Sequence, residues 1–397
     1  MGQLSRRSFL RQGAAGLLFT PFVRLPVWSR ATQSDAELIA RLTKSIPARL
    51  NDSQVPGLQI ALIREARVIW SQGFGTRSVT GKEPVNTETV FEAASLSKPA
   101  FAYMALKLCE LGKLGLDTPL TEYMPEPFIP DEPRLKLITA RMVLSHSSGL
   151  SHARPPGAPL TIGFTPGTDF SYSAPGFQYL QIVIERLTGR GLSELMDEYL
   201  LKPLGMSNSS FGWQERFRKN FAEGHGRNGK PGLSGNGRYM RMTEEQRQKF
   251  NRDYPENREP GAAAGLYTTA TDFAKYMIEI MRSSKKDKTH LSEQAVAEML
   301  RPQVKVRKAM SIGQPVRGVS WGLGWGIEET NEGDAFWHWG DWGVYRNFAV
   351  GYRNQGTGLV VMTNSFHGAR VYMEMIKEAI GGTHPALDFL LYQKMGF

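Results

Sequence analysis

A helix that opens with a serine and a lysine and then becomes almost wholly apolar constrains this chain most. The segment 91–114 reads FEAASLSKPAFAYMALKLCELGKL. Ser95 and Lys98 are three residues apart, so they share one helix face and their side chains can meet. Pro99 is tolerated only in a first turn, because it has no N–H for a helix interior. The helix is therefore predicted to begin near Ser95 and to end at Gly112.

This arrangement suggests a chemical role for the pair. A hydroxyl at the helix N-terminus lies at the positive end of the macrodipole, where a developing oxyanion is stabilised. A lysine that faces an apolar interior loses its proton more readily, so Lys98 is a candidate base for Ser95. The alternative is an N-cap serine with a solvated lysine. Ser283 and Lys286 repeat the spacing in a charged run that we expect at the surface.

Length and composition limit the classes of protein. The 397 residues are 41% hydrophobic, enough to bury one large core or two coupled ones. The single cysteine, Cys109, excludes a disulfide framework and is predicted to be a buried thiol. The histidines are scattered without metal-ligand spacing, so neither a metal nor a cofactor is expected.

The N-terminus is similar to an export signal. Residues 1–31 carry paired Arg6 and Arg7, an apolar stretch at 13–23 and no acidic residue. This pattern predicts a twin-arginine signal cleaved after Ala31, and hence a periplasmic or secreted protein. The apolar stretch is too short to span a membrane. The alternative is a disordered basic arm.

Removal of this leader changes the charge balance. The formal charge falls from +10 to +5, with 43 basic and 38 acidic residues left. The remaining basic runs, such as 282–288, are short and lack a pattern of interleaved aromatics, so they indicate a solvated face. We therefore expect a small-molecule or peptide substrate and no nucleic acid. The sequence leaves the oligomeric state open.

Both ends of the chain are expected to supply strands. Helices are predicted at 34–49 and 370–380, and two more at 193–201 and 271–282. Strand patterns follow the first helix and precede the last, and they read VPGLQIALI, RVIWSQGFG, WGLGWGIEE, AFWHWG, RNFAVGYRN and GTGLVVMTN. The predicted fold class is α/β of the α+β type: an antiparallel sheet built from both termini, flanked by helices, with an inserted and mostly helical region.

A single domain is expected after the leader, over residues 32–397. Its sheet region covers about 34–94 and 263–397, and its helical region about 95–262. The polar, Gly-rich segment 213–261 is predicted to be a surface excursion or a lid.

An ordered set of motifs resembles a known superfamily. The stretches are FEAASLSK, MVLSHSSGL, FTPGTDFSYSAPGF, KPLGMSNS, GAAAGLYTTATDFAKYM, WGLGW and HWGDWG, and together they span most of residues 55–365. In this order they resemble the serine β-lactamase and penicillin-binding-protein-like hydrolases, near the class C enzymes, the D-aminopeptidases and the β-lactamase-fold esterases. The resemblance implies a β-lactamase-like fold and a serine hydrolase that cleaves an ester or amide through an acyl-enzyme.

The resemblance also implies a set of catalytic residues. Ser95 matches the nucleophile, Lys98 its lysine, and Tyr172 the tyrosine of the second element. A phenol near a lysine ammonium ionises more easily, so we expect Tyr172 to shuttle the Ser95 proton and later to activate water.

The third element is implied on a strand beside the substrate. His338, Trp339 and Gly340 match this element, which makes His338 the fourth implied catalytic residue, and Gly340 would let the strand approach the nucleophile closely. The backbone N–H groups of Ser95 and Asp341 are then expected to form the oxyanion hole.

Two departures from the superfamily pattern favour an esterase or peptidase. Ala174 stands where an asparagine often holds the substrate amide. His338 stands where penicillin-recognising members often have a lysine, and a neutral imidazole gives no fixed charge for a carboxylate. Arg346 is the candidate to supply this positive charge in place of the lysine. The alternatives are a D-amino-acid peptidase or β-lactamase acting on cell-wall-like substrates and, from another class, a non-catalytic binding protein with this fold.

Aromatic residues gather around the third element. Trp339 and Trp342 flank the proposed oxyanion strand, so they are expected either to wall an apolar pocket or to pack in the core. Ser320 lies in a Gly-x-Ser-x-Gly pattern, but a Gly-rich strand and no helix is predicted after it, so this serine is interpreted as structural.

Overall fold

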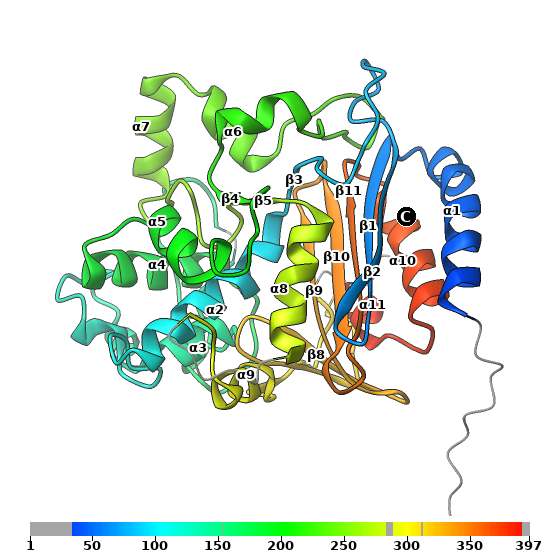
Figure 1. The fold of residues 1–397 in the computed structure, drawn as a ribbon. Helices are drawn as coiled ribbons and strands as arrows, with labels where there is room; N and C mark the ends of the chain where they lie inside the picture. The colour runs from blue at the N-terminus through cyan, green and yellow to red at the C-terminus, as the bar shows by residue number, and fades with distance from the viewer. Residues whose placement is uncertain (1–33, 153, 283–288, 311–312, 391–397) are drawn as a thin grey trace, which may run out of the picture.

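An eight-stranded sheet lies between two groups of helices, and most of the helices lie on one side of it (Figure 1). The computed structural model describes residues 34–152, 154–282, 289–310 and 313–390. The predicted signal peptide and the second serine–lysine pair, Ser283 and Lys286, lie outside the described residues.

The strands of this sheet come from both ends of the chain. They are β1 (Gly57–Arg64), β2 (Arg67–Gly75), β6 (Val304–Lys305), β7 (Val319–Trp321), β8 (Gly326–Thr330), β9 (Gly333–Asp341), β10 (Arg346–Tyr352) and β11 (Thr357–Thr363). Their order is β2-β1-β11-β10-β9-β8-β7-β6, and all neighbours are antiparallel. The predicted fold class, with a sheet built from both termini, is confirmed.

Helices cover both faces of the sheet because its strands are apolar on both sides. On one side pack α1 (Asp35–Asp52), α10 (Gly368–Ala379) and α11 (Pro385–Leu390), and on the other packs α8 (Ala270–Arg282). Leu58, Ile60 and Leu62 of β1 belong to the core on the α10 side, and Ala61 and Ile63 belong to the core on the α8 side. The alternation follows from the period of two in a strand.

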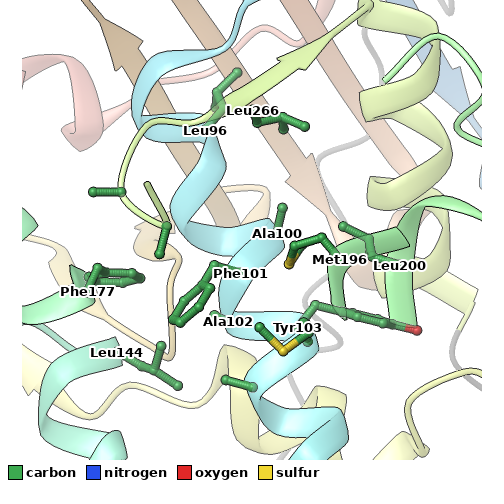
Figure 2. Packing of buried hydrophobic residues seen from close by; sticks show 14 of the residues in the cluster. Leu96, Ala100, Phe101, Ala102, Tyr103, Leu144, Phe177, Met196, Leu200 and Leu266 are labelled. Carbon is green, nitrogen blue, oxygen red and sulfur yellow. The ribbon is translucent and has the colours of Figure 1, made fainter. Parts of the chain in front are cut away.

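The inserted region is mostly helical, as predicted. Its helices are α2 (Ser97–Glu110), α3 (Ala140–Leu144), α4 (Ala174–Thr188), α5 (Leu192–Met196), α6 (Gly235–Arg241) and α7 (Glu244–Asp253), and α9 (Glu293–Leu300) packs against α2 from later in the chain. Figure 2 shows the side chains of α2 packed among residues of α3, α4 and α5. α2 ends at Glu110, and Gly112 follows with φ 68° as the predicted stop.

Two parts of the strand prediction were incomplete. WGLGWGIEE is not one strand, because a bend separates the end of β7 from β8. A second sheet of order β3-β5-β4 was also missed; its strands are β3 (Phe91–Glu92), β5 (Leu266–Thr268) and β4 (Ser210–Phe211). Strands of two or three residues are too short to show a period.

Several single-residue expectations can be compared with the fold. Cys109 is half-buried on α2, and burial raises the pKa of its thiol to about 12, which suits an inert packing role. Ser320 lies on β7 opposite Ile327 of β8, so no helix follows it.

In the described part of the chain, no helix combines the length and the apolar character that a bilayer crossing requires.

Candidate active site

Ser95 lies in a tight turn between β3 and α2. The turn is the 3-10 segment η1 (Ala94–Leu96), and α2 begins at Ser97, two residues later than predicted. Ala94 adopts φ 50°, in the left-handed region. That conformation costs a non-glycine residue about 1–2 kcal/mol, and residues held in it cluster at functional sites. The turn therefore presents Ser95 from a constrained backbone.

Strand β9 comes very close to this turn. A Cβ added to Gly340 would lie only 2.1 Å from the carbonyl oxygen of Ala93, so no larger residue fits without moving the backbone. Gly340 therefore brings the end of β9, including Asp341, beside Ser95. This is the close approach that was expected for the third element.

Lys98 is the group nearest to the Ser95 hydroxyl. Its Nζ lies 3.0 Å from Ser95 Oγ and 2.9 Å from the carbonyl oxygen of Ala263. The side chain is fully buried, and this burial lowers its pKa to about 7. A lysine that is largely uncharged just above neutral pH can accept the serine proton. The structure thus brings the predicted pair together.

Tyr172 lies close to both Lys98 and Ser95. Its ring centroid is 4.8 Å from Lys98 Nζ and 4.8 Å from the ring of Trp339. Burial raises the pKa of the phenol well above its usual value, and the Ser95 hydroxyl only partly opposes this rise. The expectation that the Tyr172 phenol ionises easily is therefore wrong. A neutral phenol is the form available in the free enzyme.

A residue that the sequence analysis did not single out fixes the position of Tyr172. His146 is fully buried with φ 56°, and its ring centroid is 4.2 Å from that of Tyr172. Its Nδ1 accepts a hydrogen bond of 3.0 Å from the backbone N–H of Ser173, which also caps α4. The only sequence signal was its place in the motif MVLSHSSGL.

His338 does not reach the cavity beside Ser95. It is fully buried, with its Nδ1 2.7 Å from the backbone oxygen of Trp339 and its ring packed against that of Trp321. Burial lowers its pKa to about 3, with a further contribution from Lys98. His338 was expected to be catalytic, but the structure has it as a neutral, buried imidazole behind the cavity wall.

A cavity of about 340 Å³ opens beside Ser95. Its lining includes most of the predicted site residues, namely Ser95, Lys98, Tyr172, Ala174, Trp339, Asp341 and Trp342. Trp321, Trp325 and Trp337 are instead buried in the cores. Of the two tryptophans for which a wall or a core position was expected, both line the cavity, and Trp339 is also part of a buried core cluster.

Arg346 is not part of the cavity lining. Its Nε lies 3.0 Å from Asp341 Oδ2, and its guanidinium packs 4.0 Å above the ring of Phe366. Only 6% of its side chain is exposed. The expectation that Arg346 replaces the missing lysine charge is therefore wrong, because its charge is used to hold Asp341 at the end of β9.

The excursion 213–261 forms part of the cavity wall. Besides the turn η5 (Glu215–Asn220) it contains α6 and α7, and it contributes Asn236, Asn257, Arg258 and Glu259 to the lining. None of these was identified from the sequence, because nothing local shows which part of a long polar segment folds back.

A buried carboxyl anchors this excursion to the strand before Ser95. Glu92 of β3 accepts hydrogen bonds from Ser234 Oγ at 2.7 Å and from Asn236 Nδ2 at 3.1 Å. Between these two residues, Gly235 packs directly on the ring of Trp342, with no space for a side chain. Burial raises the pKa of Glu92 to about 7, although both hydrogen bonds lower it.

In wild type, the free energy of unfolding is expected to fall as the pH rises, because Glu92 becomes charged in a buried site. Glu92→Gln should remove this pH dependence. A carboxyl whose folded pKa is raised contributes fully below its unfolded pKa of about 4.3. The contribution is lost as the pH rises through about 7, because the folded protein must then bury a charge. The free energy of unfolding of the variant, relative to that of wild type, should therefore increase by about 1–3 kcal/mol from pH 5 to pH 8.

Urea unfolding at the two pH values measures this difference. Glu88→Gln is the matched control, since Glu88 is an exposed carboxyl four residues earlier. Equal pH dependence in wild type and Glu92→Gln would contradict the assignment.

Comparison with known proteins agrees with this geometry. Residues 37–379 match the family model described as Beta-lactamase. The chain belongs to the beta-lactamase family. It is similar to the esterase EstB of Burkholderia gladioli, with 26% identity over 381 residues that cover 83% of this chain and 91% of EstB. The predicted resemblance is confirmed, and the protein is a serine hydrolase of this family.

Solved structures share the fold. The D-alanine carboxypeptidase AmpC of Burkholderia cenocepacia superposes with a TM-score of 0.68 and 18% identity, over 88% of this chain and 99% of the other. An octameric penicillin-binding protein homologue from Pyrococcus abyssi gives a TM-score of 0.69 and 23% identity, over 86% and 77% of the two chains.

Proposed function

We propose that the protein is an esterase that works through an acyl-enzyme on Ser95. The observation that carries the proposal is the 3.0 Å contact between Ser95 Oγ and a buried lysine whose pKa is lowered to about 7, at the wall of a cavity. The similarity to EstB over most of both chains supports an ester as the substrate.

The reaction follows from the positions of these groups. Uncharged Lys98 accepts the Ser95 proton as Oγ attacks the ester carbonyl, and the negative charge develops on the carbonyl oxygen. The backbone N–H groups of Ser95 and Asp341 stabilise that oxygen. When the intermediate collapses, the C–O bond to the alcohol breaks and the proton on Lys98 returns to the leaving oxygen, directly or through the Tyr172 hydroxyl. Water then hydrolyses the acyl-enzyme by the same steps.

The composition of the cavity favours esters over amides and β-lactams. Ala174 offers no side-chain amide to hold a substrate amide, and His338 is neutral behind the wall. An alkoxide or phenoxide can leave without prior protonation, whereas an amide nitrogen must be protonated before its C–N bond breaks, so an ester needs less help from the enzyme at this step. Peptidase and β-lactamase activities are the alternatives.

The preference can be measured directly. At pH 8, kcat/KM for p-nitrophenyl butyrate is expected to exceed that for penicillins and cephalosporins by at least about 10², since loss of one positioned polar contact costs about this much. Release of p-nitrophenol and opening of the lactam ring give the two rates. A cephalosporin turned over faster than the ester would contradict the proposal.

We also propose export to the periplasm or medium, on the basis of the paired arginines at Arg6 and Arg7. Replacing both with lysine should retain the protein in the cytoplasm, because the twin-arginine signal is read by a receptor and not by charge alone. Fractionation followed by immunoblotting measures the distribution. Unchanged export of the double variant would exclude this route.

A further inference from the structure

Arg258 occupies an unusual place at the cavity beside Ser95. It lines this cavity and also a second one of about 360 Å³, and it is the one residue that the two linings share. The second cavity has an apolar wall made by Phe128, Leu160 and Ile182 among others. Arg258 therefore borders both the cavity that contains Ser95 and this second cavity.

The hydrogen bonds of Arg258 leave one side of its guanidinium free. Its Nη1 donates to the backbone oxygens of Pro255 at 3.0 Å and Asn257 at 2.7 Å, which fixes the side chain on its own loop. Its Nε and Nη2 have no hydrogen-bond partner, and no carboxylate forms an ion pair with it, within the part of the chain that the structure describes. Nε and Nη2 together present the parallel N–H pair that binds a carboxylate in a bidentate manner.

The other charged groups near the cavity do not occupy this site. Asp341 is paired with Arg346, and Lys98 becomes largely uncharged above pH 7. The second cavity is also lined by Arg154, which is buried in an ion pair with Glu256 at 2.7 Å, and by Arg252, which is exposed and does not line the cavity beside Ser95. Glu259 lines the first cavity without pairing to Arg258. Arg258 is thus held in place by backbone contacts with its bidentate side available.

We propose that Arg258 is a specificity-determining residue that selects esters whose acyl chain ends in a carboxylate. The acyl carbonyl lies at Ser95, and the carboxylate at the end of the acyl chain binds Nε and Nη2 of Arg258. The proposal rests on the proposed esterase function and names its substrate class: monoesters of dicarboxylic acids.

The test compares charged and neutral esters of equal chain length. The mono-p-nitrophenyl esters of adipic and pimelic acid are paired with p-nitrophenyl hexanoate and heptanoate. For each pair, the ratio of kcat/KM for the acid to that for the neutral ester is measured at pH 8 in wild type, Arg258→Gln and Arg258→Lys. Arg241→Gln is the matched control, because Arg241 is an exposed arginine of the same excursion that lines neither cavity.

Arg258→Gln is expected to lower the ratio about tenfold, mainly through a higher KM for the acid, as loss of a hydrogen bond to a charged group predicts. Arg258→Lys should retain part of the preference, because it keeps the charge but loses the bidentate geometry. Arg241→Gln should keep the wild-type ratio. An unchanged ratio in Arg258→Gln, or an equal fall in Arg241→Gln, would overturn the proposal.

A binding measurement separates this proposal from the esterase function. In Ser95→Ala protein no turnover is required, and the tryptophans of the cavity wall report binding by fluorescence quenching. Adding Arg258→Gln to this background should raise the Kd for the adipate monoester about tenfold relative to hexanoate. If wild type fails to hydrolyse hexanoate, the esterase function is wrong, and the Kd values still decide the role of Arg258.

Discussion

Ser95→Ala is expected to lower kcat/KM for p-nitrophenyl butyrate by at least about 10³, because Ser95 is the one serine or threonine among the described residues that line the cavity. The variant should also lose all labelling by a fluorophosphonate probe. Peptide mapping of the labelled wild-type protein should place the adduct on Ser95, in the turn between β3 and α2.

Ser320→Ala is the matched control for this experiment. Ser320 lies on β7 in a Gly-x-Ser-x-Gly pattern but does not line the cavity, so its replacement should leave labelling and turnover intact. An adduct on Ser320, or on any serine other than Ser95, would contradict the assignment of the nucleophile.

Lys98→Arg is expected to reduce kcat by about 10² or more. The guanidinium keeps the positive charge but does not lose its proton in proteins, so it cannot act as the base. In wild type, kcat/KM should rise with pH through about 7, because the uncharged amine is the active form and burial lowers the Lys98 pKa to about 7. A stopped-flow or steady-state pH profile measures both effects.

Two results would exclude this role of Lys98. The first is near-normal activity of Lys98→Arg. The second is a wild-type profile without a rise near pH 7. Lys107→Arg provides a control for the change of side chain, because Lys107 lies on the same helix but bonds to Glu110 and to the backbone of His290, far from Ser95.

The local parts of the site could be predicted from the sequence. Ser95 and Lys98 are one helical turn apart, so their contact depends only on the period of a helix and the position of Pro99. The sheet could also be predicted. Apolar strand patterns occur at both ends of the chain, and these strands bury their apolar faces by pairing in one sheet. The near-complete burial of α2 followed from the same pattern.

The rest of the site depends on contacts between distant segments. His146 acts through the backbone of Ser173, and Arg258 reaches the cavity only because the excursion folds back over it. The position of His338 was also wrongly predicted from the sequence. Its motif places it on β9 but does not show how deeply the strand is buried there. In each case the deciding information lies in packing between segments that no local pattern relates.

The pairing of β1 with β11 has a consequence for how the protein is made. Leu58 pairs with Thr363, so the two strands are separated by about 300 residues of chain. At a synthesis rate of about 5–20 residues per second, β1 waits about 15–60 s on the ribosome for its partner. During that time β1 is paired only with β2, the apolar faces of this hairpin are uncovered by the rest of the sheet, and the nascent chain is exposed to aggregation. The yield of folded enzyme should therefore depend on chaperones that hold the first seventy-five residues until the last strand arrives.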